Sequence, residues 1–328
     1  MKGQFAILFS MIVLFVAMPW ICETCFAGQI VAWGDNTYGQ CNAPAGSEFV
    51  AIAGGGYHSL ALKSNGSLVA WGHNTYGQCD VPAGNDFVAI AAGMYHSLAL
   101  RSDGSLAAWG WNKDYHQCDV PSGNDFVAVA GGGLHSLALK SDGSLVAWGD
   151  NTYGQCEVPS GNGFVSISCG FLHSVAFKSD GSSVVWGWNE YHNLVPAGKD
   201  FAAVANSRLH SLALSFDGSL TAWGLNKYNQ CEVPEGNDFV AVAVGGCHSL
   251  ALKSAGSAKA SDLSRYEQFD VPAGSDFVAI ARGVYHGIVF VGEPVILFLL
   301  SVAALVLWKG RRGAFQESAN SEKNEHEL

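Results

Sequence analysis

The fold is decided by residues 87–110, which read FVAIAAGMYHSLALRSDGSLAAWG. Three short apolar segments fit in this stretch, with a Gly-rich turn after the first and Ser-Asp-Gly after the second. Asp-Gly between apolar segments is a strong hairpin signal, because glycine accepts the positive φ that matches strand twist. The apolar residues lack a 3.6-residue period, so the three segments are predicted to be strands.

The same unit recurs along the chain, with consecutive Trp-Gly pairs 37 to 39 residues apart. A fixed period of this size is typical of a repeat architecture. Trp marks the third strand of a unit, His begins the second strand, and both are expected to have structural roles. These residues are Trp33, Trp71, Trp109, Trp148, Trp186 and Trp223, with His58, His96, His135, His173, His210, His248 and His286.

A closed ring is the arrangement that this repeat favours. Neither face of the strands is charged, so each sheet must be covered on both sides, as when blades stack around an axis. The last repeat lacks a third strand, whereas Ile30 to Gly34 has no partner at the N-terminal end. We therefore predict an all-β seven-bladed β-propeller with about three strands per blade, whose N-terminal strand closes the last blade. An open solenoid is the alternative.

The sixth repeat departs from the pattern. Ala258 to Asp262 stands where the other repeats have the Trp-Gly strand. A blade without the large buried indole loses much of its apolar packing. We expect the sixth blade to be the weakest.

Both ends of the chain resemble targeting segments. Residues 1–27 combine Lys2, an apolar run and small residues at a cleavage position, as in a signal peptide; an uncleaved anchor is the alternative. Residues 28–292 form the propeller. Residues 293–312 are predicted to form a transmembrane helix, because an apolar run precedes Lys309, Arg311 and Arg312. Residues 293–312 resemble a PEP-CTERM sorting signal or a plain single-pass anchor. Residues 313–328 are predicted to form an acidic disordered tail. The propeller is expected outside the cytoplasm, in the envelope.

Composition and motifs narrow the function. The formal net charge of −11 argues against a nucleic-acid surface. The sequence holds no nucleophile elbow, zinc-protease motif or phosphate loop, and no cofactor is predicted. We therefore expect a binding protein and not an enzyme. A propeller lyase or hydrolase acting on extracellular polysaccharide remains the alternative.

The repeated histidines and cysteines could suggest a metal ring or disulfides. Equivalent positions on separate blades lie too far apart to share one ion or one disulfide bond. The histidines are expected to cap turn backbone groups. The mature chain has seven cysteines, an odd number that cannot pair completely, and buried free thiols are expected.

Residues 33–40, which read WGDNTYGQ, and 54–62, which read GGGYHSLAL, resemble the repeats of the regulator of chromosome condensation family. The resemblance covers about Ile30 to Val291 and implies a seven-bladed propeller. The short period and Val-Pro-Ala-Gly connector resemble the secreted bacterial beta-lactamase inhibitory propeller, which implies a binding role. Nuclear exchange on a small GTPase is rejected for this exported, acidic chain.

Strand direction places the turn after the first strand and the loop after the third strand on one face, here called the upper face. These loops vary among the repeats, whereas the lower turns are nearly uniform. Aromatic and charged residues on rigid loops are typical of protein-binding surfaces. We predict a monomeric propeller that binds an extracellular or envelope protein, unless these rings only pack on neighbouring loops. The predicted contact residues are Trp111, Lys113, Tyr115, His116, Trp188, Glu190, Tyr191, His192, Leu225 and Lys227.

Overall fold

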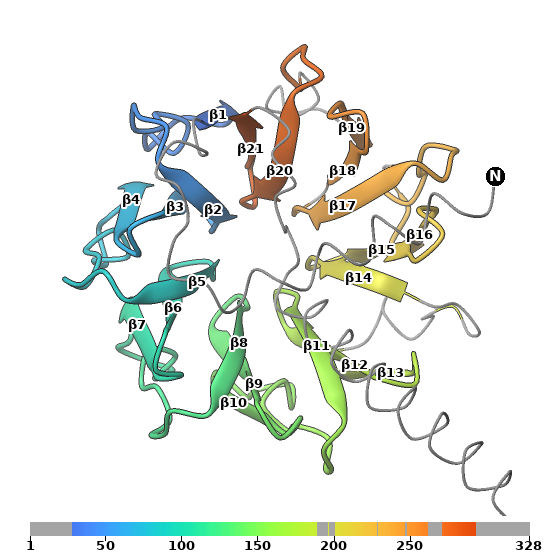
Figure 1. Cartoon of the computed structure of the whole chain (residues 1–328). Coiled ribbons are helices and arrows are strands. Elements are labelled where there is room, and N and C mark those ends of the chain that lie inside the picture. The colour runs from blue at the N-terminus through green and yellow to red at the C-terminus, as the bar shows by residue number, and fades with distance from the viewer. Residues whose placement is uncertain are drawn as a thin grey trace, which may run out of the picture.

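A computed structural model describes residues 28–188, 196, 201–227, 229–246, 248–261 and 271–292. These residues form seven antiparallel sheets of three strands each. The sheets stand around a common axis like the blades of a propeller (Figure 1). The predicted fold is confirmed. The segments predicted as a signal peptide, a transmembrane helix and a disordered tail lie outside the described residues.

Each blade contributes an inner, a middle and an outer strand. The inner strands are β2 (Phe49–Gly54), β5 (Phe87–Ala92), β8 (Phe126–Gly131), β11 (Phe164–Cys169), β14 (Phe201–Asn206), β17 (Phe239–Val244) and β20 (Phe277–Arg282). The middle strands are β3 (His58–Lys63), β6 (His96–Arg101), β9 (His135–Lys140), β12 (His173–Lys178), β15 (His210–Ser215), β18 (Ser249–Lys253) and β21 (His286–Gly292). The outer strands are β4 (Leu68–Gly72), β7 (Leu106–Gly110), β10 (Leu145–Gly149), β13 (Ser183–Gly187), β16 (Leu220–Gly224), β19 (Ala258–Ser261) and β1 (Gly28–Gly34).

The N-terminal strand closes the ring, as predicted. Strand β1 pairs antiparallel with β21 from Gly28 opposite Gly292 to Gly34 opposite His286. Blade seven therefore consists of two C-terminal strands and one N-terminal strand (Figure 1). This pairing excludes the open solenoid.

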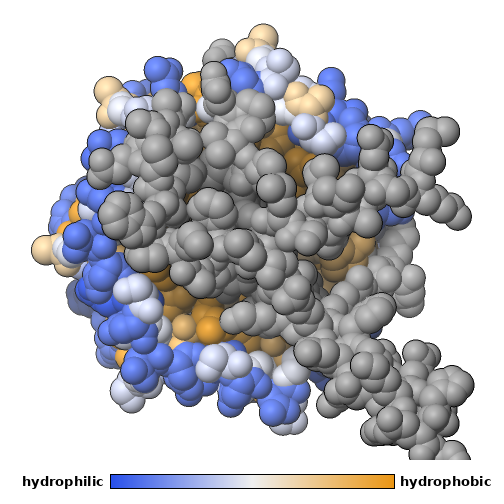
Figure 2. Space-filling model, viewed as in Figure 1, coloured by the Kyte–Doolittle hydropathy of each residue, from blue (hydrophilic) through white to orange (hydrophobic). Residues whose placement is uncertain are grey.

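The core lies between the blades. Side chains of the middle strands are buried on both faces, and Leu60, Leu98 and Leu137 are at most 1% exposed. Trp33 of β1 packs with Leu250 and Phe277 in the cluster between blades six and seven. The apolar residues visible in Figure 2 lie nearer the centre, whereas hydrophilic residues surround the rim. Burial between blades explains why the strands carry apolar residues on both faces.

The repeated histidines link one blade to the next. His286 Nε2 lies 2.9 Å from Ser59 Oγ, and Ser59 Oγ lies 3.1 Å from the Gln40 carbonyl oxygen. Because the hydroxyl hydrogen is donated to that carbonyl, Nε2 carries the proton and donates to Ser59. The same histidine-to-serine bond joins His58 to Ser97, His96 to Ser136, His135 to Ser174 and His210 to Ser249. We call these bonds the histidine belt.

The belt differs from the predicted role of the histidines. Their rings reach the next blade and bond a serine there, whereas the prediction was capping of turn backbone groups. The rings are fully buried beside the turn glycines, and a Cβ on Gly55 would overlap the His58 ring. Glycine at this position thus makes room for the imidazole.

Candidate functional site: the upper face

The upper face is held by hydrogen bonds between its two kinds of loop. The backbone N–H of the residue after each Trp-Gly donates to the residue before the blade's histidine. Examples are His73 to the Tyr57 oxygen and Trp111 to the Tyr95 oxygen, both at 2.9 Å. These bonds confirm that the two loops meet on one face.

Repeated polar side chains make the outer loops rigid. In the first loop the Gln40 side chain is fully buried, and its Oε1 accepts the Tyr38 N–H at 2.9 Å. Asn36 Oδ1 accepts the Cys41 N–H at 2.8 Å. Equivalent bonds recur in the loops of Gln78 and Gln155. Side chains that project from these loops are therefore presented on a fixed backbone.

The cysteines lie beneath the same loops as free thiols. The Sγ of Cys41, Cys79, Cys118, Cys156 and Cys231 lies 3.3 to 3.5 Å from the carbonyl oxygen of the residue after Trp-Gly. Burial raises the pKa of Cys79 to about 12, with a further contribution from Asp80. Cys169 is also a free thiol, and Cys247 lies outside the described residues. Thiols with a raised pKa are poor nucleophiles, so they do not form a reactive site.

Aromatic rings form one connected row across blades seven, one and two. Tyr57 stacks on Tyr285 with ring centroids 5.0 Å apart, and Tyr38 lies 4.6 Å from the His73 ring. Further along, the Tyr76 ring stacks on Trp111 at 5.3 Å. We call this row the aromatic arc; it comprises Tyr285, Tyr57, Tyr38, His73, Tyr76, Tyr95, Trp111 and Tyr115.

Part of the arc faces solvent. Tyr38 is 49% exposed, Tyr76 44% and Tyr115 36%. Tyr57 and Tyr95 are half-buried, and burial is the main reason that their phenol pKa values are raised. The exposed rings thus rest on a layer of partly buried ones.

The predicted contact residues have different places on this face. Trp111 and Tyr115 belong to the arc, Lys113 is exposed, and His116 pairs with Asp119 at 2.8 Å. Leu225 is half-buried, and Lys227 is exposed in the corresponding loop of blade five. Trp188 packs on Tyr153 at 6.2 Å in a separate pair. Glu190, Tyr191 and His192 lie outside the described residues.

Sequence reasoning missed most of the arc. Its tyrosines occupy two repeat positions, so the repeat pattern alone already explains them. The first position, in the loop after Trp-Gly, holds Tyr38 and Tyr76, and the second, directly before His, holds Tyr57, Tyr95 and Tyr285. The available signal was that the second position holds Tyr in blades one, two and seven but Leu134, Leu172 and Leu209 in blades three to five. Aromatic residues that occur only in neighbouring blades predict an aromatic surface on one side of the propeller.

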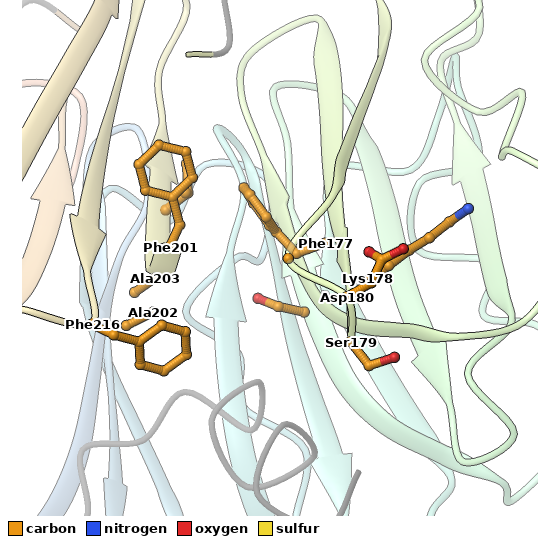
Figure 3. Close-up of a pocket in the computed structure, with 11 residues that line it drawn as sticks. Phe177, Lys178, Ser179, Asp180, Phe201, Ala202, Ala203 and Phe216 are labelled. Carbon is orange, nitrogen blue, oxygen red and sulfur yellow. The ribbon is translucent and has the colours of Figure 1, made fainter. Parts of the chain in front are cut away.

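A small hollow on the lower face lies between blades four and five. Phe177 to Asp180 form one wall, with Phe201, Ala202 and Phe216 on the other (Figure 3). Its volume is about 60 Å³, and Phe216 stands where most repeats have Ser. The lower turns are thus less uniform at this blade than the sequence pattern suggested.

Described residues 28–188, 201–227, 229–246, 248–261 and 271–292 contain no group of three or more His, Cys, Asp or Glu that could hold a metal ion. Within the same residues no helix is long and apolar enough to cross a membrane.

The ring of seven three-stranded sheets with rigid upper loops defines a seven-bladed propeller. The repeats themselves match the regulator of chromosome condensation (RCC1) repeat at residues 49–78, 87–117, 126–155 and 164–193. Four of the seven repeats are therefore RCC1 repeats, and they stand in a seven-bladed propeller.

Solved structures share this fold. Prp20p of Saccharomyces cerevisiae superposes with a TM-score of 0.70 at 18% identity, over 89% of this chain and 95% of that one. Human WBSCR16 gives 0.69 at 16% identity, over 82% and 100%. The ectodomain of the Arabidopsis thaliana receptor kinase ACR4 gives 0.57 at 21% identity, over 72% and 88%. Comparison with curated proteins found no match.

Proposed function

We propose that this propeller is displayed outside the cytoplasm, at the cell envelope, where its upper face binds a protein partner through the aromatic arc. The observation that carries the proposal is the row of rings across three blades, with Tyr38, Tyr76 and Tyr115 open to solvent. Rigid, partly exposed Tyr and Trp side chains give contact area at low entropic cost and are enriched in binding hot spots.

The relatives support a binding role. Prp20p is described together with its binding to Gsp1p and histones, and the ACR4 propeller belongs to a receptor ectodomain. Binding through an inhibitor-like contact fits the rigid loops, because a preorganised surface loses little conformational entropy on association.

The arc changes which residues should be tested. Trp111 stacks on Tyr76 and contacts Tyr95, so its removal would disturb the packing of its neighbours. Tyr38 and Tyr76 expose nearly half of their surface, so their replacement removes the exposed part of the arc and keeps Tyr57 and Tyr95.

The test is affinity capture from an envelope extract with the full chain, followed by binding measurements on the captured protein. Tyr38→Ala combined with Tyr76→Ala should weaken binding by about 100-fold or more, as for two hot-spot residues. Val88→Ser combined with Val240→Ser is the matched control, because these side chains are about equally exposed but begin inner strands away from the arc. Equal binding by both double variants would refute the arc as the contact surface.

A further inference from the structure

A cavity of about 190 Å³ lies on the axis of the ring, at the upper face. Turns from all seven blades line it, and half of the lining residues are glycine. The described lining residues include Arg208 and Arg282 but no Asp or Glu. The charged side chains among these described lining residues are thus both cations, in a protein whose formal net charge is −11.

Asn206 is the unusual member of this lining. It ends the inner strand of blade five, where blades one, two, three and six have Gly54, Ala92, Gly131 and Val244. Asn206 is only 8% exposed, and neither its Nδ2 nor its Oδ1 has a hydrogen-bond partner among the described residues. A buried amide without a hydrogen-bond partner destabilises a fold, yet blade five keeps this polar group where these four blades have small apolar residues.

Arg282 brings positive charge to the same sector. It ends the inner strand of blade seven, yet its guanidinium lies over Gly245 of blade six, where a Cβ would overlap it. The pKa values of His248 and His286 are lowered by burial and further by this cation. Blade six is the neighbour of blade five, so the Arg282 guanidinium and the Asn206 amide lie on the same side of the cavity.

Arg208 stands at the mouth of the cavity. It is exposed, and its guanidinium lies 5.4 Å from the centre of the Phe171 ring in blade four. A ligand that enters from the upper face therefore passes the Arg208 guanidinium before it reaches the Arg282 guanidinium.

We propose that the axial cavity binds a small hydroxycarboxylate anion, a function beyond partner binding by the arc. A planar carboxylate matches the donors of a guanidinium and an amide. The hydroxyl group of the hydroxycarboxylate would donate to the Asn206 Oδ1, so that both the Nδ2 and the Oδ1 of the amide gain a hydrogen-bond partner. The backbone groups of the glycine turns leave room for a ligand of a few heavy atoms.

The experiment measures binding of glycolate, acetate and chloride to the full chain by calorimetry at constant ionic strength. Glycolate should bind more tightly than acetate, and acetate more tightly than chloride. A variant that loses one hydrogen bond to the glycolate carboxylate should bind glycolate about tenfold more weakly, or weaker still.

Two variants copy residues that other blades carry at the same position, so the fold is expected to accept them. Asn206→Val copies Val244, and Arg282→Ala copies Ala92. Lys259→Gln is the control, since it removes an exposed cation on β19 away from the cavity. Glycolate binding should weaken by about tenfold or more in the first two variants and stay unchanged in the third. Absence of binding to the full chain, equal affinity for glycolate and acetate, or unchanged affinity in Asn206→Val would overturn the proposal.

Discussion

The junction between blades seven and one differs from the junction between blades six and seven. At the first, His286 bonds Ser59, as in most of the ring. At the second, blade seven has Gly287 in place of the serine, and neither ring nitrogen of His248 has a hydrogen-bond partner among the described residues. The Trp33 ring lies directly against Gly287 instead. The difference teaches that one junction is held by polar bonds and the other by apolar packing of the closing strand.

The largest expected effect is on the polar junctions and comes from acid. Burial lowers the pKa of His58, His96 and His286 to about 3, and that of His135 to about 4. The unfolded chain therefore binds more protons below pH 6.5, and stability falls as the pH drops from there towards 4. The loss is roughly 1.4 kcal/mol per pH unit for each such histidine.

The measurement is the free energy of unfolding in urea between pH 7.5 and 4.5. Its slope should correspond to the uptake of several protons on unfolding. A flat profile between pH 6.5 and 5 would show that the belt histidines titrate normally in the folded protein.

Trp33→Ala should have the next largest effect, on the apolar junction. It removes a 9% exposed indole from the cluster of Leu250 and Phe277, and a loss of about 3–5 kcal/mol is expected. Denaturant unfolding gives the value, with Tyr38→Ala as a control for loss of an exposed ring. A loss below about 1 kcal/mol would mean that closure does not depend on this packing.

Gly287→Ser tests whether the serine can simply be restored. The new Cβ would overlap the Trp33 ring, so the variant should lose about 1–3 kcal/mol although it copies the other blades. Combined with Trp33→Ala, the same substitution should cost less than it does alone. An additive pair would contradict the proposed competition for space.

Ser59→Ala tests the polar junction alone and should have the smallest effect, about 1–2 kcal/mol. It leaves the His286 Nε2 proton without its acceptor at 2.9 Å. Ser67→Ala is the control, because its hydroxyl bonds only Asn65 in an exposed turn. Equal midpoints for the two variants would show that the belt adds no stability.

Much of the fold could be predicted from the sequence, because the repeat makes each local signal appear several times. The unpaired strand around Trp33 predicted closure, which the structure confirms. The replaced strand at 258–261 is the shortest outer strand, and the lower stability of its blade stays a prediction. The histidine belt could not be predicted, since it depends on the distance between one blade's ring and the next blade's hydroxyl. The periodic sequence is the same whichever group the ring contacts.

The upper face was predicted less well. Strand direction was sufficient to place Trp111 and Tyr115 on it. The link from Tyr285 to Tyr57 joins residues at opposite ends of the repeat region and becomes visible only when the ring closes. Asn206 was missed for another reason: a single amide in an apolar strand has no distinguishing neighbours in the sequence.

The pairing of β1 with β21 has a consequence for biosynthesis. Strand β1 is synthesised before the other strands of the propeller, but its pairing partner β21 is synthesised last. During that interval blade-one residues such as Phe49 and Ala61 lack the blade-seven side chains that cover them in the finished ring. Assembly is thus completed only after the whole repeat region has been synthesised. A chain truncated before residue 286 would lack β21 and would leave the edges of β1 and β20 open to pairing with other chains.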